Sequence, residues 1–210
     1  MRTRVVSLMA CTLALVFSSE LQGVAQQQSR GASSREVLFV DYPPPPPTLR
    51  EFWDKASAVV HGTVKATSPP VADPASRRFP RAVRMQTLTV LEVLKDDRDR
   101  PIGREVMVQQ FGGTLVVQGK EYATEYPASP FQPGDEVILF LSRSATDKAY
   151  SVLIPAAGAF AVDQVSRQVT IPTLARDRIT TLRNQSSIAV DTFLATLREL
   201  KIRSVASLVR

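Results

Sequence analysis

The only histidine and the only cysteine of this 210-residue chain limit the chemistry it could perform. Zinc sites with two histidines or with paired thiolates are excluded, because His61 and Cys11 each stand alone. Cys11 lies in an N-terminal segment that we expect to be removed, which leaves no thiol nucleophile and no disulfide. His61 shares one side of an alternating stretch with Thr63 and Lys65, and this pattern favours a structural or solvent-facing role. We therefore predict no metal and no cofactor.

Three neighbouring aspartates, Asp96, Asp97 and Asp99, raise the possibility of a calcium loop. An EF-hand loop needs a central glycine and a distal glutamate in addition to acidic or amide ligands at alternate positions. Here Arg98 and Arg100 alternate with the acids and offset their charge. The pattern is more typical of a solvated turn between two strands than of a metal site.

A carboxylate-based hydrolase acting on envelope polymers is the enzymatic alternative. Its catalytic pair would have to come from five scattered acids, and nothing in their spacing selects two of them: Glu92, Glu105, Glu121, Glu125 and Asp135. The chain also lacks a Gly-x-Ser-x-Gly elbow, a phosphate-binding loop and a dinucleotide fingerprint. These absences favour a protein that is not an enzyme.

A basic group follows a proline-rich stretch and comprises Arg77, Arg78, Arg81 and Arg84. β-barrels of the OB type often bind oligonucleotides or sugars through basic and aromatic side chains. The strands predicted here carry few aromatic residues, so a solvated rim is the favoured interpretation. An exported protein is also not expected to meet nucleic acid, and the formal net charge is only +6.

The connection between Phe111 and Gly134 is the best candidate for partner binding, because long loops in compact domains are usually functional or mobile. Five of its side chains form a mixture that suits a protein or glycan partner: Lys120, Glu121, Tyr122, Tyr126 and Phe131. The alternative, which the sequence leaves open, is that the aromatic side chains only cap one end of the domain.

The N-terminus has the pattern of a secretory signal peptide. Arg2 and Arg4 precede an apolar run over residues 5–17, and small residues end at Ala25. The run is too short to span a membrane, which takes about 20 residues. We predict cleavage after Ala25, with lipid attachment at Cys11 as the alternative. The mature chain is then secreted or periplasmic and has no transmembrane segment.

The mature chain divides into three parts. Residues 26–47 are a flexible leader that ends in a polyproline spacer over residues 43–47. Residues 48–172 begin with a capping box at Thr48 and Glu51 and a short helix. Alternating strands follow, near residues 58–66, 81–94, 104–110, 136–141, 150–154, 158–162 and 168–171. Residues 173–210 are a helical segment with an apolar stripe that includes Phe193 and Leu197. This organisation predicts a mainly β protein, an OB-like closed or nearly closed barrel with a short N-terminal helix and a C-terminal helix.

Several segments together resemble a class of uncharacterised exported bacterial domains. They are the strand over residues 58–64, Val90 to Lys95, Gly112-Gly113, the turn over residues 131–135, the apolar strand 137–141 and residues 158–162. Those domains are similar in strand order to the OB-type barrel of netrin-like modules and tissue inhibitors of metalloproteinases. The resemblance covers residues 48–172 and implies a barrel but no activity. The inhibitors place an N-terminal cysteine on the catalytic zinc, and this chain has no cysteine there.

The sequence therefore predicts an exported, non-enzymatic binding module with an unknown protein or glycan partner. The hydrolase and a purely structural envelope component remain as alternatives.

Overall fold

The computed structural model describes residues 35–39, 43–76, 79–97, 99–125, 131–144 and 149–206. The predicted signal peptide, Cys11, Arg77, Arg78, Arg98 and Tyr126 lie outside these ranges. Residues 36–210 form one compact unit. In the described ranges, no helix has the length and apolar character needed to cross a membrane.

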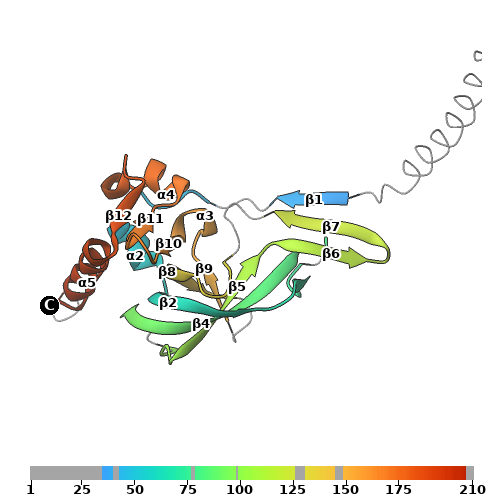
Figure 1. Cartoon of the computed structure of the whole chain (residues 1–210), viewed down its shortest axis with the longest axis horizontal. Helices are drawn as coiled ribbons and strands as arrows, with labels where there is room; N and C mark the ends of the chain where they lie inside the picture. The colour runs from blue at the N-terminus through green and yellow to red at the C-terminus, as the bar shows by residue number, and fades with distance from the viewer. Residues whose placement is uncertain are drawn as a thin grey trace, which may run out of the picture. The chain divides into compact units, whose positions relative to one another are not determined.

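The fold is mainly β with helices at both ends (Figure 1), as predicted. The strands are β1 (Arg35–Phe39), β2 (Ala58–Thr67), β3 (Val71–Ala72), β4 (Ala82–Lys95), β5 (Glu105–Phe111), β6 (Gly113–Val117), β7 (Lys120–Glu125), β8 (Glu136–Arg143), β9 (Tyr150–Val152), β10 (Ala159–Asp163), β11 (Gln168–Thr170) and β12 (Ser187–Ala189). The helices are α2 (Leu49–Lys55), α3 (Pro155–Gly158), α4 (Thr173–Arg178), the 3₁₀ turn η1 (Thr180–Leu182) and α5 (Val190–Ala206).

Five strands close into the predicted OB-like barrel. β8, β2, β4 and β5 pair in that order and antiparallel, and β9 returns to pair with β8. A parallel contact between β5 and β9, with Val108 opposite Tyr150, seals the barrel. β2 and β4 bend around it through three irregularities in their register. Gly62 lies at one of these, where a Cβ would stand 2.7 Å from the carbonyl oxygen of Thr89.

The barrel interior is filled by inward-facing apolar side chains from alternate strand positions, among them Val60, Leu88, Val108 and Leu139. Phe131, from the segment before β8, belongs to the same cluster and is 7% exposed. Removing these side chains from water is the main force that closes the sheet.

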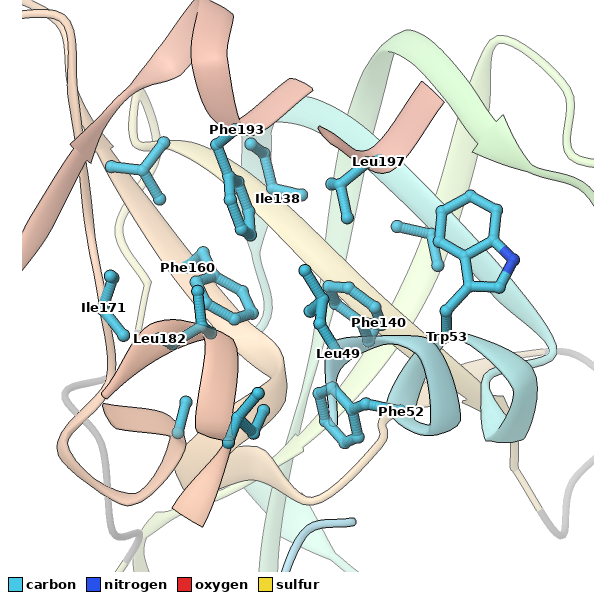
Figure 2. Close-up of a cluster of buried hydrophobic side chains, with 14 of the residues drawn as sticks. Leu49, Phe52, Trp53, Ile138, Phe140, Phe160, Ile171, Leu182, Phe193 and Leu197 are labelled. Atoms are coloured by element: carbon cyan, nitrogen blue, oxygen red, sulfur yellow. The ribbon is translucent and has the colours of Figure 1, made fainter. Parts of the chain in front are cut away.

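A second apolar core lies on the outer face of the barrel, between β8, β10 and the helices (Figure 2). A row of four phenylalanines runs through it, with ring centroids 4.9, 5.7 and 4.9 Å apart: Phe52 of α2, Phe140 of β8, Phe160 of β10 and Phe193 of α5. β8 is buried over residues 136–141, as expected for an apolar strand that is covered on both sides. Thr48 caps α2 by accepting a hydrogen bond from the amide of Glu51 at 3.1 Å.

The strands predicted near residues 150–154 and 158–162 do not pair with each other, because both pair with β8. The edge of β8 is shared, because its residues 136–139 pair with β10 and its residues 141–143 pair with β9. β10, β11 and β12 therefore extend the sheet beyond the barrel and support the second core. β12 was not predicted.

The predicted connection between Phe111 and Gly134 is largely a β-hairpin. β6 pairs along its whole length with residues 120–124 of β7, and both form a separate three-stranded sheet with β1 in the order β1-β7-β6 (Figure 1). The sequence was interpreted as a flexible leader over residues 26–47 and a long connection between Phe111 and Gly134, so the pairing of these strands was not predicted.

Candidate functional site

The structure brings three of the predicted contact residues together and places a fourth elsewhere. Lys120, Glu121 and Tyr122 all belong to β7. The ammonium of Lys120 lies 2.6 Å from a carboxylate oxygen of Glu36 on β1 and 5.1 Å from the ring centroid of Tyr122. The hydrogen bond with Glu36 raises the pKa of Lys120. Phe131 is buried in the barrel, which is the capping role that the sequence left open, and Tyr126 lies outside the described residues.

The geometry of the hairpin leaves one edge of β6 without a strand partner. Its two turn residues, Gln118 and Gly119, have φ of 52° and 76°, as a type I′ turn requires. The two residues that flank such a turn, Val117 and Lys120, exchange backbone hydrogen bonds with each other. Along an antiparallel pair this exchange recurs at every second residue, so Leu115 and Gly113 also bond to β7. The backbone N–H and C=O groups of Thr114 and Val116 therefore point away from β7. No described strand pairs with that side of β6.

This free edge also lacks the features that usually protect a sheet edge. β6 reads Gly-Thr-Leu-Val-Val, with no charged residue and no proline. Val116 is 72% exposed, and Val117 is partly exposed. An uncharged edge with exposed β-branched side chains is suited to pairing with a further extended chain.

Four polar residues lie inside the barrel at the end where the hairpin begins. We call them the polar layer: Thr67, Arg84, Gln86 and Gln110. Thr67 is opposite Gln86 and Arg84 is opposite Gln110 in the strand registers, so the four residues share the inner face. The amide nitrogen Nε2 of Gln86 donates to Oε1 of Gln110 at 2.5 Å and lies 3.4 Å from the carbonyl oxygen of Phe131. Gln86 is 0% and Gln110 is 2% exposed.

One atom of each residue in the polar layer is buried without a hydrogen-bond partner: Thr67 Oγ1, Arg84 Nε, Gln86 Oε1 and Gln110 Nε2. An unpaired buried polar atom costs about 1–3 kcal/mol, so such atoms are uncommon in folded domains. Arg84, half-buried, has no ion pair in the described chain. Of the other predicted basic residues, Arg81 pairs with Asp73 at 3.1 Å and lies over the Phe111 ring. Sequence reasoning missed this layer.

The opposite end of β4 leads to a buried cluster that is fully hydrogen-bonded. Asp97 is 3% exposed, which corrects the prediction that it belongs to a solvated turn. Its two carboxylate oxygens accept from Arg143 at 2.8 and 2.5 Å, and the Tyr150 hydroxyl lies 3.2 Å from one of them. The hydrogen bonds from Arg143 lower the pKa of Asp97 to about 2. Burial, followed by the charge of Asp97, raises the pKa of Tyr150 to about 12.

A cleft of about 440 Å³ adjoins this cluster and is lined by charged groups that are already engaged. Lys95 donates to the carbonyl oxygens of Trp53 and Ala56 at the end of α2, and Arg50 pairs with Asp54 at 3.0 Å. In the ranges that the structure describes, no three acids, histidines or cysteines are arranged to hold a metal ion.

His61 is buried rather than solvent-facing, at 7% exposure. Its Nε2 lies 2.8 Å from Oε1 of Glu136, which also accepts from Arg167 at 3.1 Å. Burial alone would raise the pKa of Glu136, but the hydrogen bonds with His61 and Arg167 hold it below its usual value. Of the two predicted roles for His61, the structural one is therefore the one that fits its position.

The five acids of the hydrolase alternative are spread over β4, β5, β7 and the turn before β8, and most of them already have partners. Glu92 of β4 pairs with Arg198 of α5 at 2.6 Å, and Glu105 of β5 pairs with Lys65 of β2 at 2.6 Å. The carboxylate of Asp135 accepts from the amide of Gln132 at 2.7 Å, and Glu121 and Glu125 belong to β7. None of the three described cavities is lined by two of these acids.

Neither a protein-family model nor a curated protein sequence matches this chain.

Proposed function

We propose that this chain is an exported, non-enzymatic binding module of the periplasm or cell exterior, and that it captures a partner protein by strand addition to β6. The observation that carries the proposal is the free edge of β6, where the backbone groups of Thr114 and Val116 point outward beside exposed valines. A row of alternating N–H and C=O groups is complementary to another extended polypeptide. A protein partner is therefore favoured over a glycan.

Export is supported by the basic start, the short apolar run and the small residues before Gln26. The resemblance to netrin-like modules concerns the barrel and stays a prediction. The barrel and the second core would act as the scaffold that holds the hairpin, because rigid elements position binding groups better than loops do.

The test compares capture of partners from an envelope extract by the mature chain and two edge variants. Val116→Lys places a charge on the edge, and Val116→Pro removes an outward donor, so both should abolish capture while thermal stability stays nearly unchanged. Val165→Lys is the matched control, because Val165 is 96% exposed in the turn between β10 and β11. Equal capture by all variants would defeat the proposal.

A further inference from the structure

The polar layer accounts for nearly all the unpaired buried atoms of the described chain. Of the five such side-chain atoms, four belong to Thr67, Arg84, Gln86 and Gln110, and the fifth is Nε of Arg81, directly before β4. The contact of Gln86 Nε2 with the carbonyl oxygen of Phe131 would be lost if the oxygen and nitrogen of the Gln86 amide were exchanged.

The unpaired atoms define the chemistry of what would satisfy them. Arg84 Nε and Gln110 Nε2 are donors, the Thr67 hydroxyl can donate, and Gln86 Oε1 is an acceptor. Arg84 carries a positive charge with no acidic partner in the described chain, so the complementary group is an anion with several acceptor oxygens. The C-terminus of a peptide offers a planar carboxylate for the donors and, two bonds from the carboxylate carbon, a backbone N–H for the acceptor.

The direction of β6 places such a C-terminus at the polar layer. β6 begins at Gly113 and runs toward the hairpin tip. A Cβ on Gly113 would stand 3.3 Å from Nε of Arg84, so the start of β6 adjoins Arg84. An antiparallel strand added to the free edge runs the opposite way, and its carboxyl end arrives beside Gly113. Arg84 is half-buried, so part of its side chain is exposed at this end of the barrel, whereas its Nε is buried.

We propose that the C-terminal segment of a partner protein pairs antiparallel with β6 and that its terminal carboxylate binds Arg84, Gln110 and Thr67. This inference depends on the proposed function, since it needs the β6 edge to be a binding site. It adds the polarity of the bound strand, the requirement for a free C-terminus and the residues that recognise it.

The test uses a library of hexapeptides in two forms, one with free C-terminal carboxylates and one with amidated C-termini, and the purified mature chain. Binders are expected only in the free-carboxylate form. Against the tightest binder, Arg84→Gln should raise the dissociation constant about tenfold or more, because a charge-assisted hydrogen bond is lost. Thr67→Val keeps the shape of the side chain and should raise the constant by about threefold. Arg104→Gln, which removes the same charge from an exposed position before β5, should not change it.

Each outcome decides the inference. Equal binding of amidated peptides, unchanged affinity in Arg84→Gln, or no binder in either form overturns it. Amidated peptides that bind the native chain but not Val116→Pro would overturn only the C-terminal recognition and leave strand addition to β6 intact. Concentration-dependent dimerisation that Val116→Lys abolishes, without peptide binding, would show that the edge pairs with a second copy of the chain and would also overturn the inference.

Discussion

The barrel has a buried polar cluster at each end of β4, and the two differ in how completely they are hydrogen-bonded. The cluster after β4 joins Asp97 to Arg143 and Tyr150, and both carboxylate oxygens of Asp97 have partners. The polar layer near the start of β4 makes one short hydrogen bond between two amides and leaves four atoms unpaired. Each cluster contains fully buried polar residues, Asp97 and Tyr150 in one and Gln86 and Gln110 in the other, so burial alone does not explain the difference.

A satisfied cluster stabilises the fold that contains it, whereas an unsatisfied one destabilises it until something else provides the missing partners. The Asp97 cluster can therefore be understood as part of the structure. The polar layer lies beside the free edge of β6, where a partner would bind, and its deficit is most simply explained as a requirement of binding.

Replacing Asp97 by alanine should lower the free energy of unfolding by about 3 kcal/mol, because Arg143 loses two charge-assisted hydrogen bonds and keeps only its exposed partner Asp99, while the Tyr150 hydroxyl keeps only the carbonyl of Arg100. Urea denaturation measures the effect. Asp99→Ala is the control, because that side chain is 76% exposed and its pair with Arg143 should contribute less than about 1 kcal/mol. Similar losses in the two variants would show that the Asp97 cluster is not the structural element described above.

The stabilising contribution of the Asp97 cluster should be lost in acid. Asp97 has its pKa lowered from 3.8 to about 2 in the folded chain, so its contribution is fully present above pH 3.8 and is lost as the pH falls through about 2. The loss amounts to about 2 kcal/mol at most. The free energy of unfolding of the native chain, measured at a series of pH values, should show this loss in acid. If the Asp97→Asn variant shows the same loss, other carboxylates are responsible for it.

Substitutions in the polar layer should not destabilise the fold, in contrast to substitutions in the Asp97 cluster. Replacing Gln86 and Gln110 together by leucine removes their unpaired atoms, and the free energy of unfolding should stay the same or rise by about 1 kcal/mol. Calorimetry of the double variant measures the change. A loss of more than about 2 kcal/mol would mean that the amides stabilise the fold, and the contrast between the two ends would fail.

Tyr150 should titrate at a pKa of about 12, above the usual 10, and the absorbance of its phenolate reports this. A raised pKa means that the stability contributed by the neutral phenol is intact below pH 10 and is lost as the pH rises through 12. Tyr150→Phe should cost only about 0.5 kcal/mol, because Arg143 still holds Asp97. Titration at the usual value would indicate that the hydroxyl is not bound to Asp97.

The parts of the fold that follow from local pattern were predictable. The apolar run over residues 136–141 predicts a buried central strand, and the stripe containing Phe193 and Leu197 predicts a packed terminal helix. The shared edge of β8 was not predictable, because no local signal shows that one strand divides its pairing between β9 and β10.

The candidate site was predicted only in part. The sequence selected Lys120, Glu121 and Tyr122 as contact residues but treated their segment as a loop, because Gln118-Gly119 is a less familiar type I′ turn than Asn-Gly. Burial of Asp97 depends on Arg143, 46 residues later, and the Gln86–Gln110 pair spans 24 residues. Contacts between residues so far apart in the chain produce no recognisable pattern in the amino-acid sequence.

The parallel pairing of β5 with β9 has a consequence for how the chain folds. Val108 and Tyr150 seal the barrel although they are 150 − 108 = 42 residues apart. During synthesis from the N-terminus, β2, β4 and β5 can pair early. The barrel interior remains hydrated until β9 is made and pairs with β5. Lengthening the hairpin inside this closure adds only about 0.6 kcal/mol of loop entropy per doubling. The hairpin can therefore grow or change in sequence with little effect on whether the barrel closes.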